Sequence, residues 1–130
     1  MVKVHDGDTI TLLDSNNTQH KIRLAQIDAP ELGQPWGRNS KQALTALVIY
    51  KTVKIVVVDT DRYGRTVGTV RLGELDVCRQ QVVTGNAWVY RQYMTDSSLL
   101  DNEEQAKLEG DGLWSDPNPT PPWEWRRQNR

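Results

Sequence analysis

The sequence is poor in the residues that build covalent or metal-rich scaffolds. Its 130 residues contain a single cysteine, Cys78, and two histidines, His5 and His20. A lone cysteine excludes an internal disulfide framework and a cysteine-rich zinc site, and we expect Cys78 to be a small buried residue. Neither histidine has a recognisable catalytic partner in the sequence, so we expect both to lie at strand edges without a catalytic role.

Net charge and long hydrophobic runs are also lacking. The formal net charge is −1, so no overall basic field attracts nucleic acid, and any recognition of phosphate has to be local. No apolar run approaches the roughly 18 residues that a membrane-spanning helix needs. The chain opens directly with the strand-like Met1-Val2-Lys3-Val4, so we expect no signal peptide within it. The compartment stays unassigned, because a secreted or periplasmic location would require a signal segment upstream of Met1.

What the sequence does contain is a series of short segments with β-type alternation. The length is that of a single domain. Strands are expected over residues 9–13, 21–24, 53–58 and 66–72. Asp14-Ser15-Asn16-Asn17 has the composition of a turn and predicts a hairpin between the first two strands. Arg62-Tyr63-Gly64 predicts a second turn, between the last two.

Helical spacing is found in three places. Residues 38–50 bring apolar side chains onto one face, Asp76 can cap a helix over 77–84, and a third helix is expected from Ser97 or Ser98 to Gly110 or Gly112. This order of strands and helices is compatible with a mainly β domain, a small Greek-key barrel such as the OB-fold. Prolines cluster at the start of residues 116–130, so we expect an extended tail over the surface. Trp123 and Trp125 would pin that tail to the body or, alternatively, stack on bases.

Four short segments bring acids, arginines and glycines together. Asp6-Gly7-Asp8-Thr9 offers two hard carboxylate ligands for Ca²⁺ or Mg²⁺, although a solvated turn has the same composition. Asp28-Ala29-Pro30-Glu31 offers a further ligand and a general base, Glu31, and is also compatible with a plain turn. Arg23 lies in mid-strand, where an inward side chain would need an anion and an outward one would not. Asp61-Arg62-Tyr63-Gly64-Arg65 presents two arginines and a phenol at what could equally be an ordinary hairpin tip.

Together these segments supply the groups that phosphodiester hydrolysis requires. A metal ion binds the phosphate and a water molecule, arginines stabilise the charge that grows on the phosphoryl oxygens, and a carboxylate receives the proton of the water. Arginine suits this role better than lysine because its planar fork can bind two phosphate oxygens at once. The combination therefore favours a metal-dependent phosphodiesterase.

The sequence resembles the staphylococcal nuclease (thermonuclease) family in five segments that follow one another in order. They are Asp6-Gly7-Asp8-Thr9, Arg23-Leu24 with Asp28-Ala29-Pro30-Glu31, Arg62-Tyr63-Gly64-Arg65, Gly85-Asn86-Ala87-Trp88-Val89-Tyr90 and Gly112-Leu113-Trp114. Because the resemblance covers nearly the whole chain, it implies a five-stranded OB-fold Greek-key barrel with three α-helices. We assign that domain to residues 1–115 and the Pro/Trp-rich tail to residues 116–130.

The resemblance also implies a calcium-dependent endonuclease that hydrolyses DNA and RNA with little sequence specificity. By this likeness Ca²⁺ is held by Asp8, Asp28 and the backbone carbonyl of Ala29. Asp6 and Thr9 fall in the matching motif as residues that support the metal ligands. No protein partner is implied, and we expect a monomer.

The same resemblance assigns the groups that act on the substrate. Arg23 and Arg65 would contact the phosphate that is cut, and Glu31 would act as the base. Tyr63 would lie against the nucleotide, and Tyr93 keeps a phenol nearby, where Arg91 stands in place of a tyrosine of the staphylococcal enzyme. Residues 32–39 form a much shorter loop than the lysine-rich loop of that enzyme, so a basic clamp on the substrate is not expected.

Two rival interpretations compete with an enzyme. A non-catalytic nucleic-acid-binding or protein-binding module of the same family would be expected to have lost metal-binding acids or arginines. Here all five remain, namely Asp8, Arg23, Asp28, Glu31 and Arg65. A dedicated single-strand binder would carry a basic groove with aromatic residues on the barrel strands, and the four predicted strands carry no aromatic residue. The sequence thus favours the nuclease.

Overall fold

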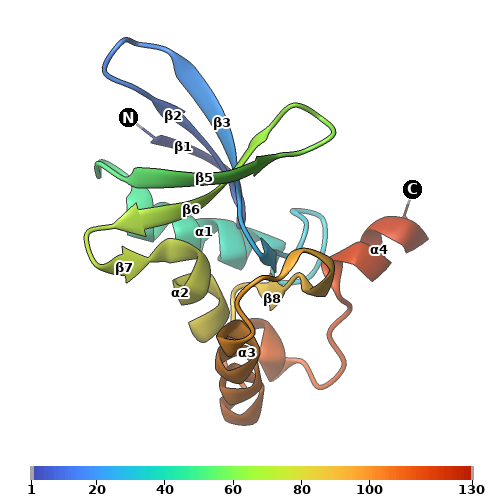
Figure 1. The fold of residues 1–130 in the computed structure, drawn as a ribbon. Coiled ribbons are helices and arrows are strands. Elements are labelled where there is room, and N and C mark those ends of the chain that lie inside the picture. Colours follow the sequence, from blue (N-terminus) through green and yellow to red (C-terminus); the bar gives the residue numbers. More distant parts are fainter. Residues whose placement is uncertain (1, 130) are drawn as a thin grey trace.

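The fold, a twisted sheet backed by helices, is described by a computed structural model for residues 2–129 (Figure 1). Its strands are β1 (Val2–Asp6), β2 (Thr9–Leu13), β3 (Gln19–Leu24), β4 (Ile27–Asp28), β5 (Lys54–Thr60), β6 (Thr66–Leu72), β7 (Leu75–Asp76) and β8 (Trp88–Val89). Its helices are α1 (Gly37–Val48), α2 (Val77–Val83), α3 (Ser98–Glu109) and α4 (Pro122–Gln128), with 3-10 turns η1 (Arg91–Tyr93) and η2 (Gly112–Ser115). The four strands and three helices predicted from spacing are confirmed, with ends shifted by a few residues.

The main sheet has the strand order β1-β2-β3-β6-β5, with β7 paired to β6. Strands β1, β2 and β3 form an antiparallel meander, whereas β6 runs parallel to β3 with Val67 opposite Arg23. The prediction of a closed barrel is wrong for the described residues, since β1 and β5 do not pair and the sheet stays open. Closure would need the two edge strands to meet. Strand β1 pairs with β2 along one edge only, and β5 pairs with β6 along one edge only.

The core lies between this sheet and the helices. Helix α1 buries Ser40, Leu44 and Val48, which are four residues apart and so share one face, and it packs on β1. Helix α2 packs between β6 and α3. Each fully buried leucine or valine contributes about 1.5–3 kcal/mol to stability. Cys78 is buried in this core, as expected. None of the helices within residues 2–129 combines the length and apolar character that crossing a membrane requires.

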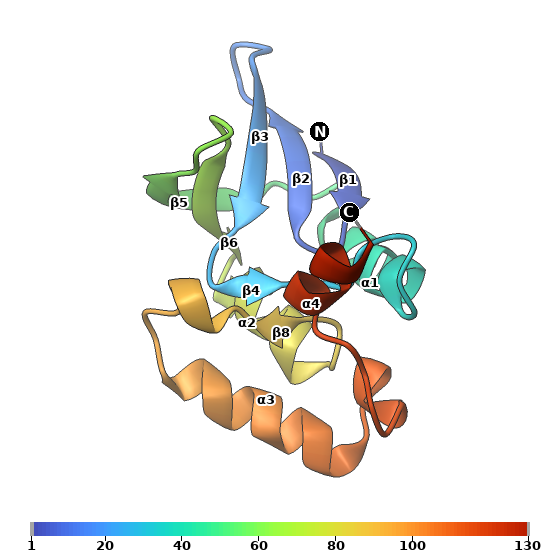
Figure 2. The ribbon, with the colours of Figure 1, turned by 90° about the vertical axis from the view of Figure 1, so that its right-hand side faces the viewer.

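The C-terminal tail differs from the prediction, because it contains a fourth helix. Proline is tolerated in the first turn of a helix, where its missing N–H would have no partner, and Pro122 starts α4 in this way. No further proline or glycine follows before Gln128, so the helix continues. Helix α4, in red in Figure 2, lies beside β4 and the loop that precedes α1. Before Pro122 the tail is not helical, but it bends at residues 116–118, so the prediction of an extended tail holds only for residues 119–121.

A small second sheet, β4 paired with β8, carries one of the predicted metal ligands. In its register Asp28 lies opposite Trp88, and Ile27 lies opposite Val89. The backbone N–H of Val89 donates a hydrogen bond of 2.7 Å to the buried Glu103 of α3. Glu103 lies in an acid-rich helix, and unlike the exposed Glu104 beside it, it is buried. Its carboxylate is buried because it holds β8, and through β8 it holds β4.

Candidate active site

The turn between β1 and β2 brings two acidic residues against α1. A side chain in place of the Gly7 hydrogen would have its Cβ 1.8 Å from Ser40 Oγ and 2.7 Å from Ala29 Cβ, so only glycine fits there. This close approach places Asp6 and Asp8 next to the segment that follows β4. Asp8 Oδ2 accepts a hydrogen bond of 2.7 Å from the backbone N–H of Ala29.

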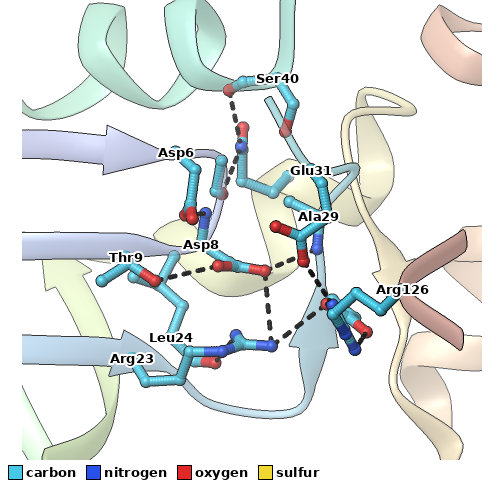
Figure 3. Close-up of polar contacts among 12 residues, drawn as sticks. Asp6, Asp8, Thr9, Arg23, Leu24, Ala29, Glu31, Ser40 and Arg126 are labelled. Atoms are coloured by element: carbon cyan, nitrogen blue, oxygen red, sulfur yellow. Dashed lines mark hydrogen bonds and ion pairs between the residues drawn. The ribbon is translucent and has the colours of Figure 1, made fainter. Parts of the chain in front are cut away.

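Asp8 and Asp28 converge on the guanidinium of Arg23 (Figure 3). Arg23 Nη2 lies 3.4 Å from Asp8 Oδ2 and 3.3 Å from Asp28 Oδ1, and Arg23 Nη1 donates to the carbonyl of Leu24 at 3.0 Å. The Arg23 side chain is only 13% exposed. Of the two interpretations of this arginine, the inward-facing one is therefore correct. Thr9 lies opposite Arg23 on β2, and its hydroxyl donates to Asp8 Oδ1 at 3.1 Å.

Burial and the closeness of several negative charges shift the pKa values of the acids in this cluster. Partial burial and the neighbouring Asp8 raise the pKa of Asp6 to about 7. Burial, opposed by hydrogen bonds from Arg126, raises the pKa of Asp28 to about 6. Burial alone would raise the pKa of Asp8, but the charge of Arg23 and the hydrogen bonds to the Asp8 carboxylate together outweigh it, and the net shift is downward. The pKa of Arg23 is raised, because Asp8 and Asp28 outweigh its own burial. The cluster favours additional positive charge.

A second arginine, which sequence reasoning missed, enters the site from α4. Arg126 Nη2 lies 2.7 Å from Asp28 Oδ2, and Arg126 Nη1 lies 3.1 Å from Asp28 Oδ1 and 2.6 Å from Glu31 Oε1 (Figure 3). Asp28 is 1% exposed and Glu31 is 32% exposed. One sequence signal pointed this way. Trp123 and Arg126 are three residues apart and thus share a face of any helix formed there.

The donor set fits a hard divalent cation. Asp8 and Asp28 offer carboxylate oxygens that reach the same Arg23 nitrogen, and oxygen ligands are those that Ca²⁺ prefers. Within residues 2–129 no three or more His, Cys, Asp and Glu side chains form a metal-binding group. The expected ligand set contains only two such side chains, the carboxylates of Asp8 and Asp28, and its third ligand is the backbone carbonyl of Ala29.

Arg65 and Tyr63 lie on the β5–β6 hairpin, where no contact among the described residues joins them to the acidic cluster. Arg65 Nε donates to Asp61 Oδ2 at 2.7 Å, and its guanidinium lies 5.7 Å from the centre of the Tyr63 ring. Arg65 lies one residue before β6, in which Val67 pairs with Arg23 of β3.

Tyr93 lies on η1, and the C-terminal Trp123 lies on α4. Tyr93 is exposed, and its ring lies edge-on to Tyr90, with the centres 5.0 Å apart. Trp123 stacks on the ring of Tyr90, and the two ring planes are 4° from parallel. This contact fits the interpretation that Trp123 pins the tail to the body. The structure thus brings Asp6, Asp8, Thr9, Arg23, Asp28, Ala29 and Glu31 together and leaves Tyr63, Arg65 and Tyr93 at its margins.

Comparisons with known proteins identify relatives of this chain. Residues 21–116 match the family model described as staphylococcal nuclease homologue. An uncharacterized endonuclease of Haemophilus influenzae is 43% identical over the whole chain and 73% of its own length. A protein of the same name from Escherichia coli O157:H7 is 44% identical over 98% of the chain and 84% of its own length. A micrococcal nuclease of Shigella flexneri is 38% identical over the whole chain and 80% of its own length. The matches that span the whole chain include the Asp6–Asp8 turn and α4.

Proposed function

Since the chain belongs to the family of staphylococcal nuclease homologues, we propose that it is a calcium-dependent endonuclease that hydrolyses the phosphodiester bonds of DNA and RNA. The observation that carries this proposal is the convergence of Asp8 and Asp28 on Arg23, with Glu31 at the rim of the same cluster. The names of the relatives, endonuclease and micrococcal nuclease, support the same reaction class.

The carboxylates and the backbone would hold the cation. Asp8, Asp28 and the carbonyl of Ala29 would bind Ca²⁺, which when bound supplies Lewis-acid stabilisation of phosphoryl charge. Asp6 and Thr9 would fix the orientation of Asp8, because Asp6 accepts the backbone N–H of Asp8 and Thr9 donates to its carboxylate.

Arg23 and Glu31 would act on the phosphate from within the cluster. Arg23 engages the chain through one Nη1 hydrogen and through Nη2, so among the described contacts Nε and a second Nη1 hydrogen stay available for phosphate oxygens. Glu31 would take the proton of the attacking water while a new oxygen–phosphorus bond forms and the bond to the leaving oxygen breaks. Arg65, together with Tyr63, would approach the phosphate and the nucleotide from the hairpin. Tyr93 would contact the nucleotide from the side of α4.

The test is cleavage of labelled single-stranded DNA and RNA of mixed sequence. We expect products with millimolar CaCl₂, much less product with MgCl₂ because Mg²⁺ demands a more regular ligand shell, and none with excess chelator. Cleavage at full rate in chelator would remove the metal from the mechanism. Binding of the oligonucleotides without cleavage under all conditions would favour a non-catalytic module instead.

A further inference from the structure

Arg126 joins the two acids to which the proposed chemistry gives different tasks. Its guanidinium binds both carboxylate oxygens of Asp28, a proposed metal ligand, and one oxygen of Glu31, the proposed base. The partners are 98 and 95 residues away along the chain. Its neighbour Arg127 pairs locally with Glu124 on the same helix and has no described contact with the site. The engagement of the acids is therefore specific to one arginine of α4.

The helix that carries Arg126 belongs to a C-terminal arm, residues 116–129, that is docked by side chains rather than by strand pairing. Trp123 stacks on Tyr90 with the ring centres 5.5 Å apart and meets the edge of Trp88 at 5.6 Å. The side-chain amide of Gln34 donates to the carbonyl of Thr120 at 2.5 Å. These contacts set the position of α4 and hence the reach of Arg126.

The packing beneath the arm is incomplete. A cavity of about 110 Å³ separates part of the arm from the body, and its walls include Pro30, Trp36, Trp88 and Trp125. Protein interiors are normally close-packed, and the walls of a void lose contacts. The Arg126 side chain itself is 39% exposed. Both features lower the cost of lifting the arm relative to that of opening the core.

A divalent cation and the Arg126 guanidinium would both bind the negatively charged carboxylate of Asp28. In this structure the Arg126 guanidinium pairs with the Asp28 carboxylate from the solvent side. The Arg23 guanidinium contacts the same carboxylate from the interior. A cation bound to Asp28 would lie next to the guanidinium, and two positive groups that share one carboxylate repel each other. Exchange of the arginine for the cation also frees Glu31, which the guanidinium otherwise holds as a hydrogen-bond acceptor.

We propose that Arg126 is an intramolecular occupant of the cation site, so that docking of the C-terminal arm and binding of Ca²⁺ exclude each other. This rests on the proposed function only in assigning Asp28 to the cation. In the docked state the acids are neutralised and held in place, and in the open state they are available to metal and water. The arm thus acts as an autoinhibitory latch that Ca²⁺ displaces.

The primary test is a CaCl₂ titration of the intact chain without nucleic acid, followed by amide NMR shifts, at pH 8.5. The variants are Arg126→Gln and Trp123→Ala, with Arg127→Gln as the matched control. Arg126→Gln and Trp123→Ala should each bind Ca²⁺ about tenfold more tightly than the wild type, as expected if the arm is docked roughly nine-tenths of the time. Arg127→Gln removes one positive charge from the same helix and should shift the affinity by less than about twofold.

Trp123→Ala separates the latch from a plain charge effect, because it loosens the arm and leaves every charge in place. An unchanged or weaker affinity in this variant overturns the proposal even if Arg126→Gln binds more tightly. A weaker affinity in Arg126→Gln would overturn it as well, since Arg126 would then organise the site rather than occupy it. Absence of Ca²⁺ binding in all four proteins also refutes the competition.

Hydrogen exchange of the wild type gives a second readout. The amides of Glu124, Trp125 and Asn129 are bonded within the arm, and a helix as short as α4 is not stable once it is undocked. Saturating Ca²⁺ should therefore speed their exchange at least tenfold and leave β2 and β3 unaffected. An arm that keeps its protection in Ca²⁺ contradicts the latch. Neither experiment measures cleavage. A protein that shows the competition and cuts nothing would refute only the nuclease, and a nuclease without the competition would refute only the latch.

Discussion

Asp6 Oδ1 accepts a hydrogen bond of 3.0 Å from the backbone N–H of Asp8, which places two carboxylic acids side by side in one turn. The pKa values of the two acids shift in opposite directions. Arg23 stabilises the charged form of Asp8, whereas burial and the negative charge of Asp8 destabilise the charged form of Asp6. The pKa of Asp6 is therefore raised to about 7, whereas that of Asp8 is lowered. Near neutral pH the turn carries a proton that an unfolded chain would release.

This relationship predicts how stability depends on pH in the metal-free protein. The folded pKa of Asp6 is about 7 and lies above its unfolded value of roughly 3.9. Its contribution to stability is thus complete below pH ~4 and lost as the pH rises through ~7. Asp6→Asn cannot ionise, so relative to wild type it should gain about 2 kcal/mol or more in unfolding free energy between pH 4 and pH 8. Urea unfolding in EDTA measures this, with the exposed Glu74→Gln as the control. Parallel pH profiles for Asp6→Asn and wild type would contradict the prediction.

Glu31→Gln separates binding from chemistry. The amide keeps the shape of the side chain and an acceptor for Arg126, but it cannot take a proton at neutral pH. We expect kcat on a single-stranded oligonucleotide to fall about 100-fold or more, with substrate affinity nearly unchanged, because Glu31 has no attraction for phosphate. Glu124→Gln on the exposed side of α4 should leave both constants unchanged. A kcat within a few-fold of wild type would show that Glu31 is not the base.

Arg65→Lys tests whether the hairpin takes part in the reaction. Lysine keeps the positive charge but loses the planar fork, so attraction for nucleic acid and its salt dependence should persist. If Arg65 donates to the phosphate as charge develops, kcat should fall by about 100-fold, equivalent to about 2.7 kcal/mol. Arg62→Lys, which alters the other arginine beside the Tyr63 ring, is the matched control and should have little effect. Equal kcat values for both variants would leave Arg23 as the only arginine that acts on the phosphate.

The parts of the fold that the sequence predicts are those set by local periodicity. Alternation gives β2, β3, β5 and β6, and the buried stripe of Ser40, Leu44 and Val48 gives α1. The grouping of Asp8, Arg23 and Asp28 in one site follows from the resemblance to the nuclease family, because each local motif by itself is also compatible with a plain turn or strand. The roles of these residues in catalysis stay predictions until they are measured.

The features that were missed depend on contacts between distant segments. Arg126 meets Asp28 across 98 residues, and its position follows from the stacking of Trp123 on Tyr90, which no local pattern encodes. Closure of the barrel depends on whether β1 meets β5, and strand propensity does not reveal that. The burial of Glu103 depends on Val89 and Arg91 lying beneath α3, whereas the adjacent Glu104 is exposed.

Glu103 offers the last prediction, a test of how β8 and the acidic site depend on α3. Its buried carboxylate accepts the N–H of Val89 at 2.7 Å and is paired with Arg91 and, at 3.6 Å, with Lys107. Gln at position 103 keeps one acceptor but presents an amide group to positive partners, so buried donors lose a charged acceptor. We expect Glu103→Gln to lower the unfolding free energy by about 1–3 kcal/mol. The exposed Glu104→Gln should change it by less than about 0.5 kcal/mol.

Because β8 pairs with β4 at Trp88 and Asp28, the amide of Val89 should also exchange faster in Glu103→Gln than in the control. Matching urea midpoints for the two variants would mean that the Glu103 carboxylate does not stabilise β8, and that β4 is held in place by its own packing.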